Sequence, residues 1–211
     1  MSAPTLLFIG DSITEAGRDH ADQDDLGRGW VSVVDQLLRA ESGPARRLVN
    51  LGIGGNRLQD LAARWQRDCL DLRPAVVTIQ IGINDTWRRF DGNEPSELDR
   101  FVDGYRELLR QFEGLVGSRI VLVEPFCLPT GVVTPAWRED LDPRIAAVVG
   151  LAEEFDAARV PLDRAMADAA ARADPAAWTT DGVHPTPAGH ALIAGEWLAA
   201  TTAGSAARRV G

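Results

Sequence analysis

The stretch LLFIGDSITEAG, residues 6–17, decides both the fold and the place of its chemistry. Its first four residues are apolar, which predicts a short strand buried on both faces. The strand ends directly at Gly10, Asp11 and Ser12, although a buried strand has little reason to end on polar groups in that order. Two interpretations follow: an ordinary turn in which Ser12 caps the next helix, or a turn that presents a hydroxyl group for chemistry.

Similar short apolar runs recur along the chain and alternate with segments of helical period. The further runs are residues 47–50, 75–81, 119–124 and 159–162. Helical stripes of apolar residues occupy 30–38, 58–65 and 101–115, and Thr186 followed by Pro187 predicts a further helix to about residue 200. This alternation predicts a parallel sheet covered by helices on both faces, with the ligand site beyond the carboxyl ends of the strands.

Length and composition indicate one globular domain. The 211 residues are 45% hydrophobic and 25% charged, and we expect a single domain over 1–211. The formal net charge of -9, without a cluster of Lys and Arg, argues against binding to nucleic acid. No segment reads as a signal peptide or a membrane span, which predicts a cytoplasmic protein that does not contact membranes. The loops at 18–29 and 126–143 are expected at the surface or at the active site.

The cysteines and the acidic loop give no sign of a metal. Cys69 and Cys127 lie far apart in unrelated contexts, so we expect two buried free thiols and neither a disulfide nor a metal pair. Asp22, Asp24 and Asp25 read most simply as a solvated face, because no calcium-binding spacing follows them. No metal and no organic cofactor is therefore expected.

The sequence DGVH near the C-terminus supplies what a serine nucleophile needs. A serine hydroxyl attacks well only when a base takes its proton and a third group orients that base. Asp181 and His184 are three positions apart, so the carboxylate can accept from Nδ1 of the ring and leave Nε2 for Ser12. His184 alone is also compatible with an ordinary, partly buried histidine.

Attack on a carbonyl also requires hydrogen-bond donors for the negative oxygen that develops. Gly55 and Asn84 each follow a predicted strand. We expect the Gly55 N–H, the Asn84 side-chain amide and the Ser12 N–H to converge on one point, since a residue without Cβ allows close approach to a substrate.

Four blocks of sequence together carry a resemblance to a known family. They are GDSIT at 10–14, NLGIGGN at 50–56, GIND at 82–85 and DGVHP at 181–185. In order and approximate spacing they resemble the motif blocks of the SGNH hydrolases, the GDSL-type esterase superfamily. The resemblance implies a flavodoxin-like α/β/α sandwich of three layers with a five-stranded parallel sheet.

The same resemblance implies roles for individual residues. Ser12 is the expected nucleophile, Asp181 and His184 complete the catalytic triad, and Ser12, Gly55 and Asn84 form the oxyanion hole. Within the superfamily the chain is most similar to bacterial intracellular acetylxylan esterases. The stretches that carry this similarity are LLFIGDSIT with AGR, LGRGWV, ARW and IGINDTWRRFD.

The expected reaction is the removal of O-acetyl groups from carbohydrates, with acetylated xylo-oligosaccharides as the substrate, through an acyl-enzyme. An aromatic face and a guanidinium at the mouth of such a site suit a sugar, which makes Trp87 and Arg88 candidate substrate-binding residues, with Trp178 as a third. Ordinary packing is the alternative for each tryptophan. The expected partner is a small-molecule ester, and the sequence leaves open whether the chain forms a homo-oligomer.

Other functions are open from the sequence. A lysophospholipase or thioesterase would use the same residues on a longer acyl group. A phosphotransferase of the haloacid-dehalogenase type would need a second carboxylate where Ile13 stands, which makes it a poor match. A sugar-binding protein without catalytic activity would keep the fold alone.

Overall fold

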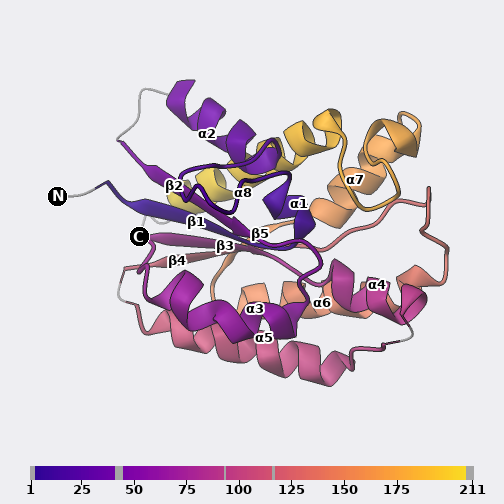
Figure 1. Ribbon diagram of the computed structural model, residues 1–211, viewed down its shortest axis with the longest axis horizontal. Coiled ribbons are helices and arrows are strands. Elements are labelled where there is room, and N and C mark those ends of the chain that lie inside the picture. Colours follow the sequence, from indigo (N-terminus) through magenta and orange to yellow (C-terminus); the bar gives the residue numbers. More distant parts are fainter. Residues whose placement is uncertain (1–2, 41–44, 93, 116, 208–211) are drawn as a thin grey trace.

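A five-stranded, entirely parallel sheet forms the centre of the molecule (Figure 1). The computed structural model describes residues 3–40, 45–92, 94–115 and 117–207. In spatial order the strands are β2 (Arg47–Gly52), β1 (Thr5–Gly10), β3 (Val76–Gln80), β4 (Arg119–Val123) and β5 (Ala158–Val160). This strand order is the flavodoxin-like one.

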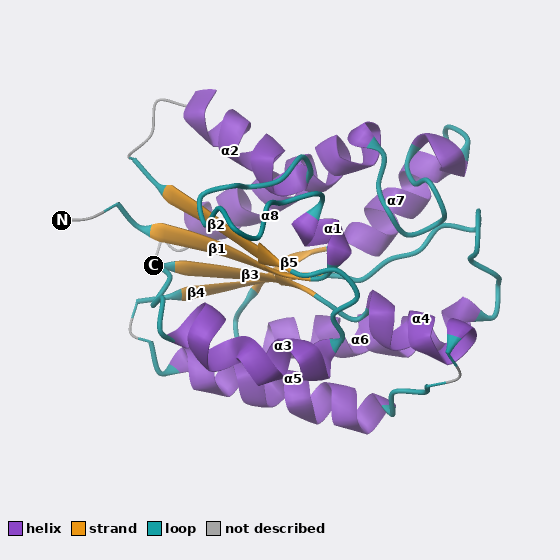
Figure 2. Ribbon diagram, viewed as in Figure 1, coloured by secondary structure: helices purple, strands orange, loops and turns teal. Residues whose placement is uncertain are grey.

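Helices cover both faces of the sheet, which gives three layers (Figure 2). One face carries α2 (Trp30–Ala40), α7 (Leu162–Ala170) and α8 (Pro187–Ala207), and the other carries α3 (Leu58–Trp65), α5 (Leu98–Glu113) and α6 (Trp137–Glu154). The short helices α1 (Ser12–Glu15) and α4 (Ile83–Asp91) directly follow β1 and β3. A π-helical turn, Gln66–Leu70, extends α3, and a 3₁₀ turn covers Pro175–Ala177. The predicted α/β/α sandwich is confirmed.

The inner strand β1 illustrates how the sheet is buried on both faces. Leu6 and Phe8 belong to the apolar cluster formed with α2 and α8, whereas Leu7 and Ile9 belong to the cluster formed with α3 and α5. The Phe8 ring lies 5.1 Å from that of Trp30, edge to face. Alternate side chains of one strand therefore anchor two separate helical layers.

The segment 126–143 differs from its prediction as a loop. Helix α6 already begins at Trp137, and Phe126, Cys127 and Leu128 are buried beside the sheet. These residues lie between strand and helix, where apolar side chains can pack without regular secondary structure. The prediction of a surface or active-site loop over the whole segment is therefore wrong.

Three further expectations can be checked in the fold. Thr186 caps α8 as predicted, because its Oγ accepts from the N–H of Gly189 at 3.2 Å, although the helix continues to Ala207. Cys69 and Cys127 are buried free thiols, as predicted. Within the described residues, no helix is both long enough and apolar enough to cross a bilayer.

Candidate active site

The candidate site lies where the winding of the sheet reverses. The chain passes from β1 to β2 on one side and then to β3 on the other side of β1. Ser12 follows β1, Gly55 lies in the turn after β2, and Asn84 follows β3. The carboxyl ends of neighbouring parallel strands meet at this edge, which is where ligands bind in open α/β sheets.

Ser12, His184 and Asp181 form one continuous hydrogen-bonded chain. Ser12 Oγ lies 3.0 Å from Nε2 of His184, although the two residues are 172 positions apart in the sequence. On the other side of the ring, Nδ1 lies 2.6 Å from Oδ2 of Asp181. The second carboxylate oxygen of Asp181 accepts from the backbone N–H groups of Val183 and His184. The imidazole is thus held in the tautomer that accepts a proton at Nε2.

A tight turn holds Asp181 and His184 in register. Thr180 N donates to the carbonyl of His184 at 2.8 Å, and Thr179 bridges to Pro185. Gly182 has a φ of 98°, and a Cβ there would lie 2.4 Å from the carbonyl oxygen of Thr130. Glycine is therefore required at this position, both for the backbone angle and for the close approach.

The pKa values of two aspartates at the site are shifted in opposite directions. Burial raises the pKa of Asp181, but hydrogen bonds from the His184 ring and from two backbone N–H groups outweigh it and hold this pKa below its ordinary value. Asp11 is fully buried, and burial raises its pKa to about 7, although the Ile13 N–H donates to it. Asp11 thereby caps the N-terminus of α1.

Of the predicted oxyanion donors, Gly55 lies in the turn of residues 53–56, and Asn84 is hydrogen-bonded to that turn. The turn of residues 53–56 is closed by a bond of 3.2 Å from Asn56 N to the carbonyl of Ile53, and its third residue, Gly55, has a φ of 76°. Among the described residues, nothing accepts a hydrogen bond from Gly55 N. Asn84 Nδ2 donates to the carbonyl of Asn56 at 3.1 Å, which fixes the side-chain amide and leaves its second hydrogen for a ligand.

Asp85, next to Asn84, is an anchoring residue. One carboxylate oxygen accepts from the N–H of Leu58 and the other from the hydroxyl of Ser96, both at 3.1 Å. Burial raises the pKa of Asp85 despite these bonds. The carboxylate therefore ties the start of α4, which carries Asn84, to the start of α3.

Arg64 organises the site, and the sequence analysis did not single it out. It is 8% exposed and donates to the carbonyls of Gly10 and Leu51 at 3.0 and 2.8 Å, and to Oδ1 of Asn56 at 2.9 Å. It also pairs with Asp68. The ends of β1 and β2 and the following turn are thereby linked. The sequence signal that could have indicated this role is an arginine, Arg64, within the predicted apolar helix of 58–65.

Asn50 is a second positioning residue that was missed. It is fully buried; its Nδ2 donates to the carbonyls of Thr14 and Leu26, and its Oδ1 accepts from the N–H of Gly52. These bonds join β2 to α1 and to the loop at 18–29. An asparagine inside an apolar strand is the sequence signal for such a side chain, because a buried amide needs hydrogen-bond partners.

The predicted substrate-binding residues divide into two groups. The Trp87 ring lies 5.6 Å from the His184 ring and 5.3 Å from that of Trp137, so it forms an aromatic wall beside His184. Arg88 pairs with Asp91, and its Nη2 would lie 3.8 Å from a Cβ placed on Gly55.

Trp178 is in a different position from Trp87 and Arg88. It packs against the apolar cluster under α2 and α8, and its carbonyl accepts from Thr186 N at 2.9 Å. No ring contact with His184 is present among the described residues. These contacts are those of ordinary packing. Through its carbonyl, Trp178 also holds the residue that follows the DGVHP turn, Thr186.

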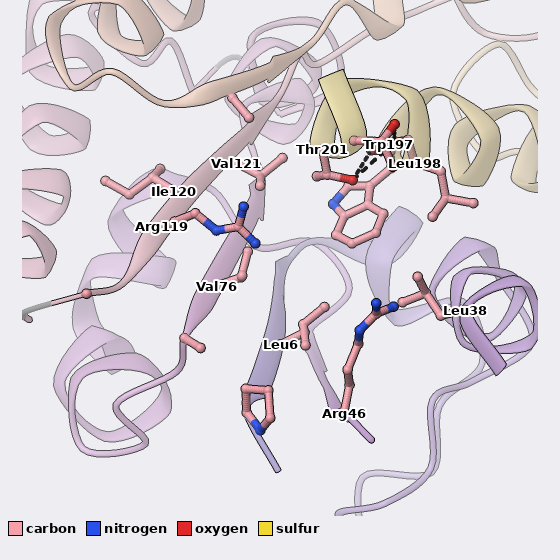
Figure 3. A pocket seen from close by; sticks show the side chains of 15 residues that line it. Leu6, Leu38, Arg46, Val76, Arg119, Ile120, Val121, Trp197, Leu198 and Thr201 are labelled. Atoms are coloured by element: carbon pink, nitrogen blue, oxygen red, sulfur yellow. Dashed lines mark hydrogen bonds between the residues drawn. The ribbon is translucent and has the colours of Figure 1, made fainter. Parts of the chain in front are cut away.

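Elsewhere in the described residues there is a further pocket but no candidate metal site. In the described part of the chain, no group of three or more His, Cys, Asp and Glu side chains could hold a metal ion. A pocket of about 410 Å³ opens at the opposite edge, where the strands begin, between Leu6, Val76 and Trp197, with Arg46 and Arg119 at its border (Figure 3). None of the predicted catalytic residues lines it.

Comparisons with known proteins agree with this geometry. Residues 8–192 match the model of the GDSL-like Lipase/Acylhydrolase family. An acetylxylan esterase of Geobacillus stearothermophilus is 38% identical over 208 residues, which cover 93% of each chain. The crystal structure of Axe2, an acetylxylan esterase from Geobacillus stearothermophilus, is similar with a TM-score of 0.86, at 36% identity and 93% coverage of each chain. Esterase TesA of Pseudomonas aeruginosa is 35% identical over 100 residues, 47% of this chain and 45% of that protein.

Further crystal structures show variants of the Geobacillus esterase described as catalytic mutants. In these variants an aspartate, a serine or a histidine is replaced by alanine. Their chains match this one with TM-scores of 0.86, 0.86 and 0.87.

Proposed function

Because the chain belongs to the GDSL-like lipase/acylhydrolase family and is a carboxylic ester hydrolase, we propose that it removes O-acetyl groups from acetylated xylo-oligosaccharides through an acyl-enzyme. The observation that carries this proposal is the chain of contacts from Ser12 Oγ to His184 Nε2, at 3.0 Å, and from His184 Nδ1 to Asp181, at 2.6 Å.

The reaction proceeds in two halves. Ser12 Oγ attacks the acetyl carbonyl carbon while its proton passes to Nε2 of His184, and the imidazolium then gives that proton to the departing sugar oxygen. In the second half, His184 takes a proton from water, whose oxygen attacks the acyl carbon. The bond from that carbon to Ser12 Oγ then breaks, the imidazolium returns its proton to Ser12 Oγ, and acetate leaves. Asp181 stabilises the imidazolium in both halves. The N–H groups of Ser12 and Gly55, together with the Asn84 amide, bind the oxyanion.

The relatives support this assignment of roles. The catalytic mutants of the Geobacillus esterase lack an aspartate, a serine or a histidine, the same three residue types as here. The aspartate and the histidine replaced in that enzyme stand three positions apart, as Asp181 and His184 do.

The substrate class rests on the neighbours of the triad and on the relatives. The wall of Trp87 offers an aromatic face for a sugar ring, and the Arg88 guanidinium, close to Gly55, offers donors to sugar hydroxyls. One relative of known structure is described as an acetyl-xylooligosaccharide esterase. We also expect the protein to act in the cytoplasm on oligosaccharides taken up by the cell.

The experiment that tests the proposal is acetate release from acetylated xylo-oligosaccharides by wild type and Ser12→Ala. We expect Ser12→Ala to lose at least about a thousandfold in kcat while its melting temperature stays unchanged, because the acyl-enzyme can no longer form. Asp35→Ala, a change in a surface ion pair on α2, is the matched control and should keep full activity.

Two outcomes would contradict the proposal. A Ser12→Ala variant as active as wild type would show that Ser12 is not the nucleophile. A preference for octanoyl over acetyl esters of the same alcohol would show that the activity is lipase-like or thioesterase-like and not that of an acetylesterase.

A further inference from the structure

Glu15, at the end of α1, touches the turn that carries one of the oxyanion donors. Its carboxylate oxygen Oε2 accepts a hydrogen bond from the N–H of Gly54, and Oε1 lies 2.5 Å from Nε2 of His20. The Glu15 side chain is 23% exposed, so the carboxylate is partly shielded from solvent. The sequence analysis gave neither Glu15 nor His20 a role.

The turn packs closely against α1. A Cβ on Gly52 would lie 2.2 Å from Glu15 N, and a Cβ on Gly54 would lie 2.8 Å from Oε2 of Glu15 and 3.8 Å from Cβ of Ser12. The backbone of these glycines therefore lies directly on the helix that begins with Ser12. Glu15 and the serine are on the same short element, three positions apart.

The turn needs an anchor because its two central residues are both glycine. Type I and type II turns differ mainly in the orientation of the peptide between the central residues, and glycine at both positions permits either orientation. That peptide joins Gly54 to Gly55 and carries the Gly55 N–H. The φ of 76° at Gly55 belongs to the type II form.

We propose that Glu15 is a positioning residue for the oxyanion hole: its carboxylate holds Gly54 N–H, and thereby the Gly55 N–H, in place beside Ser12, while His20 fixes the carboxylate. This inference rests on the proposed function. Glu15 itself does not touch the substrate. Its contribution appears in the transition state, where the oxyanion forms, and only weakly in substrate binding.

The test compares Glu15→Ala, Glu15→Gln and the control Asp35→Ala, which removes a similarly shielded carboxylate from an ion pair on α2. We expect Glu15→Ala to lower kcat about 10- to 100-fold, less than the full loss of an oxyanion donor, with KM changed less than about twofold. Glu15→Gln keeps an oxygen that can accept from Gly54 N–H and should restore kcat to within about threefold of wild type.

A second readout separates positioning from general destabilisation. A boronic acid forms a tetrahedral adduct with an active-site serine, so its affinity should fall in parallel with kcat in Glu15→Ala, whereas the melting temperature should match that of Asp35→Ala. An unchanged kcat in Glu15→Ala, or an equal loss in Glu15→Gln, overturns the inference. If Ser12→Ala itself stays active, the proposed function has failed instead, whatever Glu15→Ala does.

Discussion

Asp11 precedes Ser12 directly, and its carboxyl group is completely buried. One oxygen accepts from the Ile13 N–H, whereas the other has no hydrogen-bond partner among the described residues. Burial raises its pKa to about 7 from the ordinary value of 3.8. Between these values the folded protein binds a proton that the unfolded chain has released, so stability falls as the pH rises.

We predict that Asp11→Asn removes this pH dependence. The amide resembles the protonated carboxyl group and can still accept from Ile13 N–H, so the variant gains stability relative to wild type as the pH rises, up to a limit of about 4 kcal/mol. Urea unfolding of both proteins at about pH 5 and about pH 8.5 measures the difference. An equal difference at the two pH values would show that Asp11 does not titrate in this range.

At the scale of single residues, the sequence indicated the candidates for chemistry, whereas two buried residues that position them were missed. Ser12, Asn84 and His184 stand in motif blocks directly after strands or before a helix, so their residue types and places were informative. Arg64 and Asn50 act through carbonyls of segments distant in sequence. Which carbonyls remain unpaired depends on how loops pack, and this is not encoded in local sequence patterns.

At the scale of elements, α4 and α6 are joined through Asp140. This carboxylate accepts from the Thr86 hydroxyl at 2.8 Å and from Arg89 at 3.1 Å, both on α4, and from Arg144 of α6 at 3.0 Å. Burial raises the pKa of Asp140, but the bonds from Arg144 and Thr86 outweigh it and lower the pKa below its ordinary value. The helix that carries Asn84 and Trp87 is thereby fixed on α6.

We predict that Asp140→Ala destabilises the protein by about 3 kcal/mol, because it leaves the Arg144 guanidinium, only 1% exposed, without its carboxylate. The variant should also lose kcat, since α4 is then held less firmly. Chemical denaturation and acetyl ester turnover measure the two effects. Glu139→Ala, at the exposed neighbouring position, is the control; a similar loss of stability in both variants would argue against the role of the ion pair.

Helix α6 also shows why an element can be missed from the sequence. Its buried residues change sides along its length: Trp137 and Leu141 pack into the cluster with α2 and α8, whereas Val148 and Leu151 pack into the cluster with α3 and α5. Pro143 lies inside the helix. A helix that packs into two apolar clusters has no single apolar stripe. Proline is also unusual in the interior of a helix, so neither sequence signal predicts α6. The strands, α2, α3, α5 and α8 carry simpler patterns and could be predicted.

At the scale of the whole molecule, one sheet joins the two apolar clusters, since strands β1 to β4 each contribute side chains to both of them. We propose that residues 1–211 form a single cooperative domain and predict one unfolding transition. Loss of far-ultraviolet circular dichroism, of tryptophan fluorescence and of esterase activity should have the same midpoint, and the calorimetric and van't Hoff enthalpies should agree. Separate midpoints would divide the molecule into independent units.

The distance of 172 positions between Ser12 and His184 has a consequence for the chain during its synthesis. In the proposed mechanism Ser12 needs the imidazole of His184, which is translated 172 positions later. A nascent chain that stops before Asp181 and His184 is therefore expected to carry an unactivated hydroxyl. Ester-cleaving activity should begin only after these two residues have been translated and have folded against Ser12.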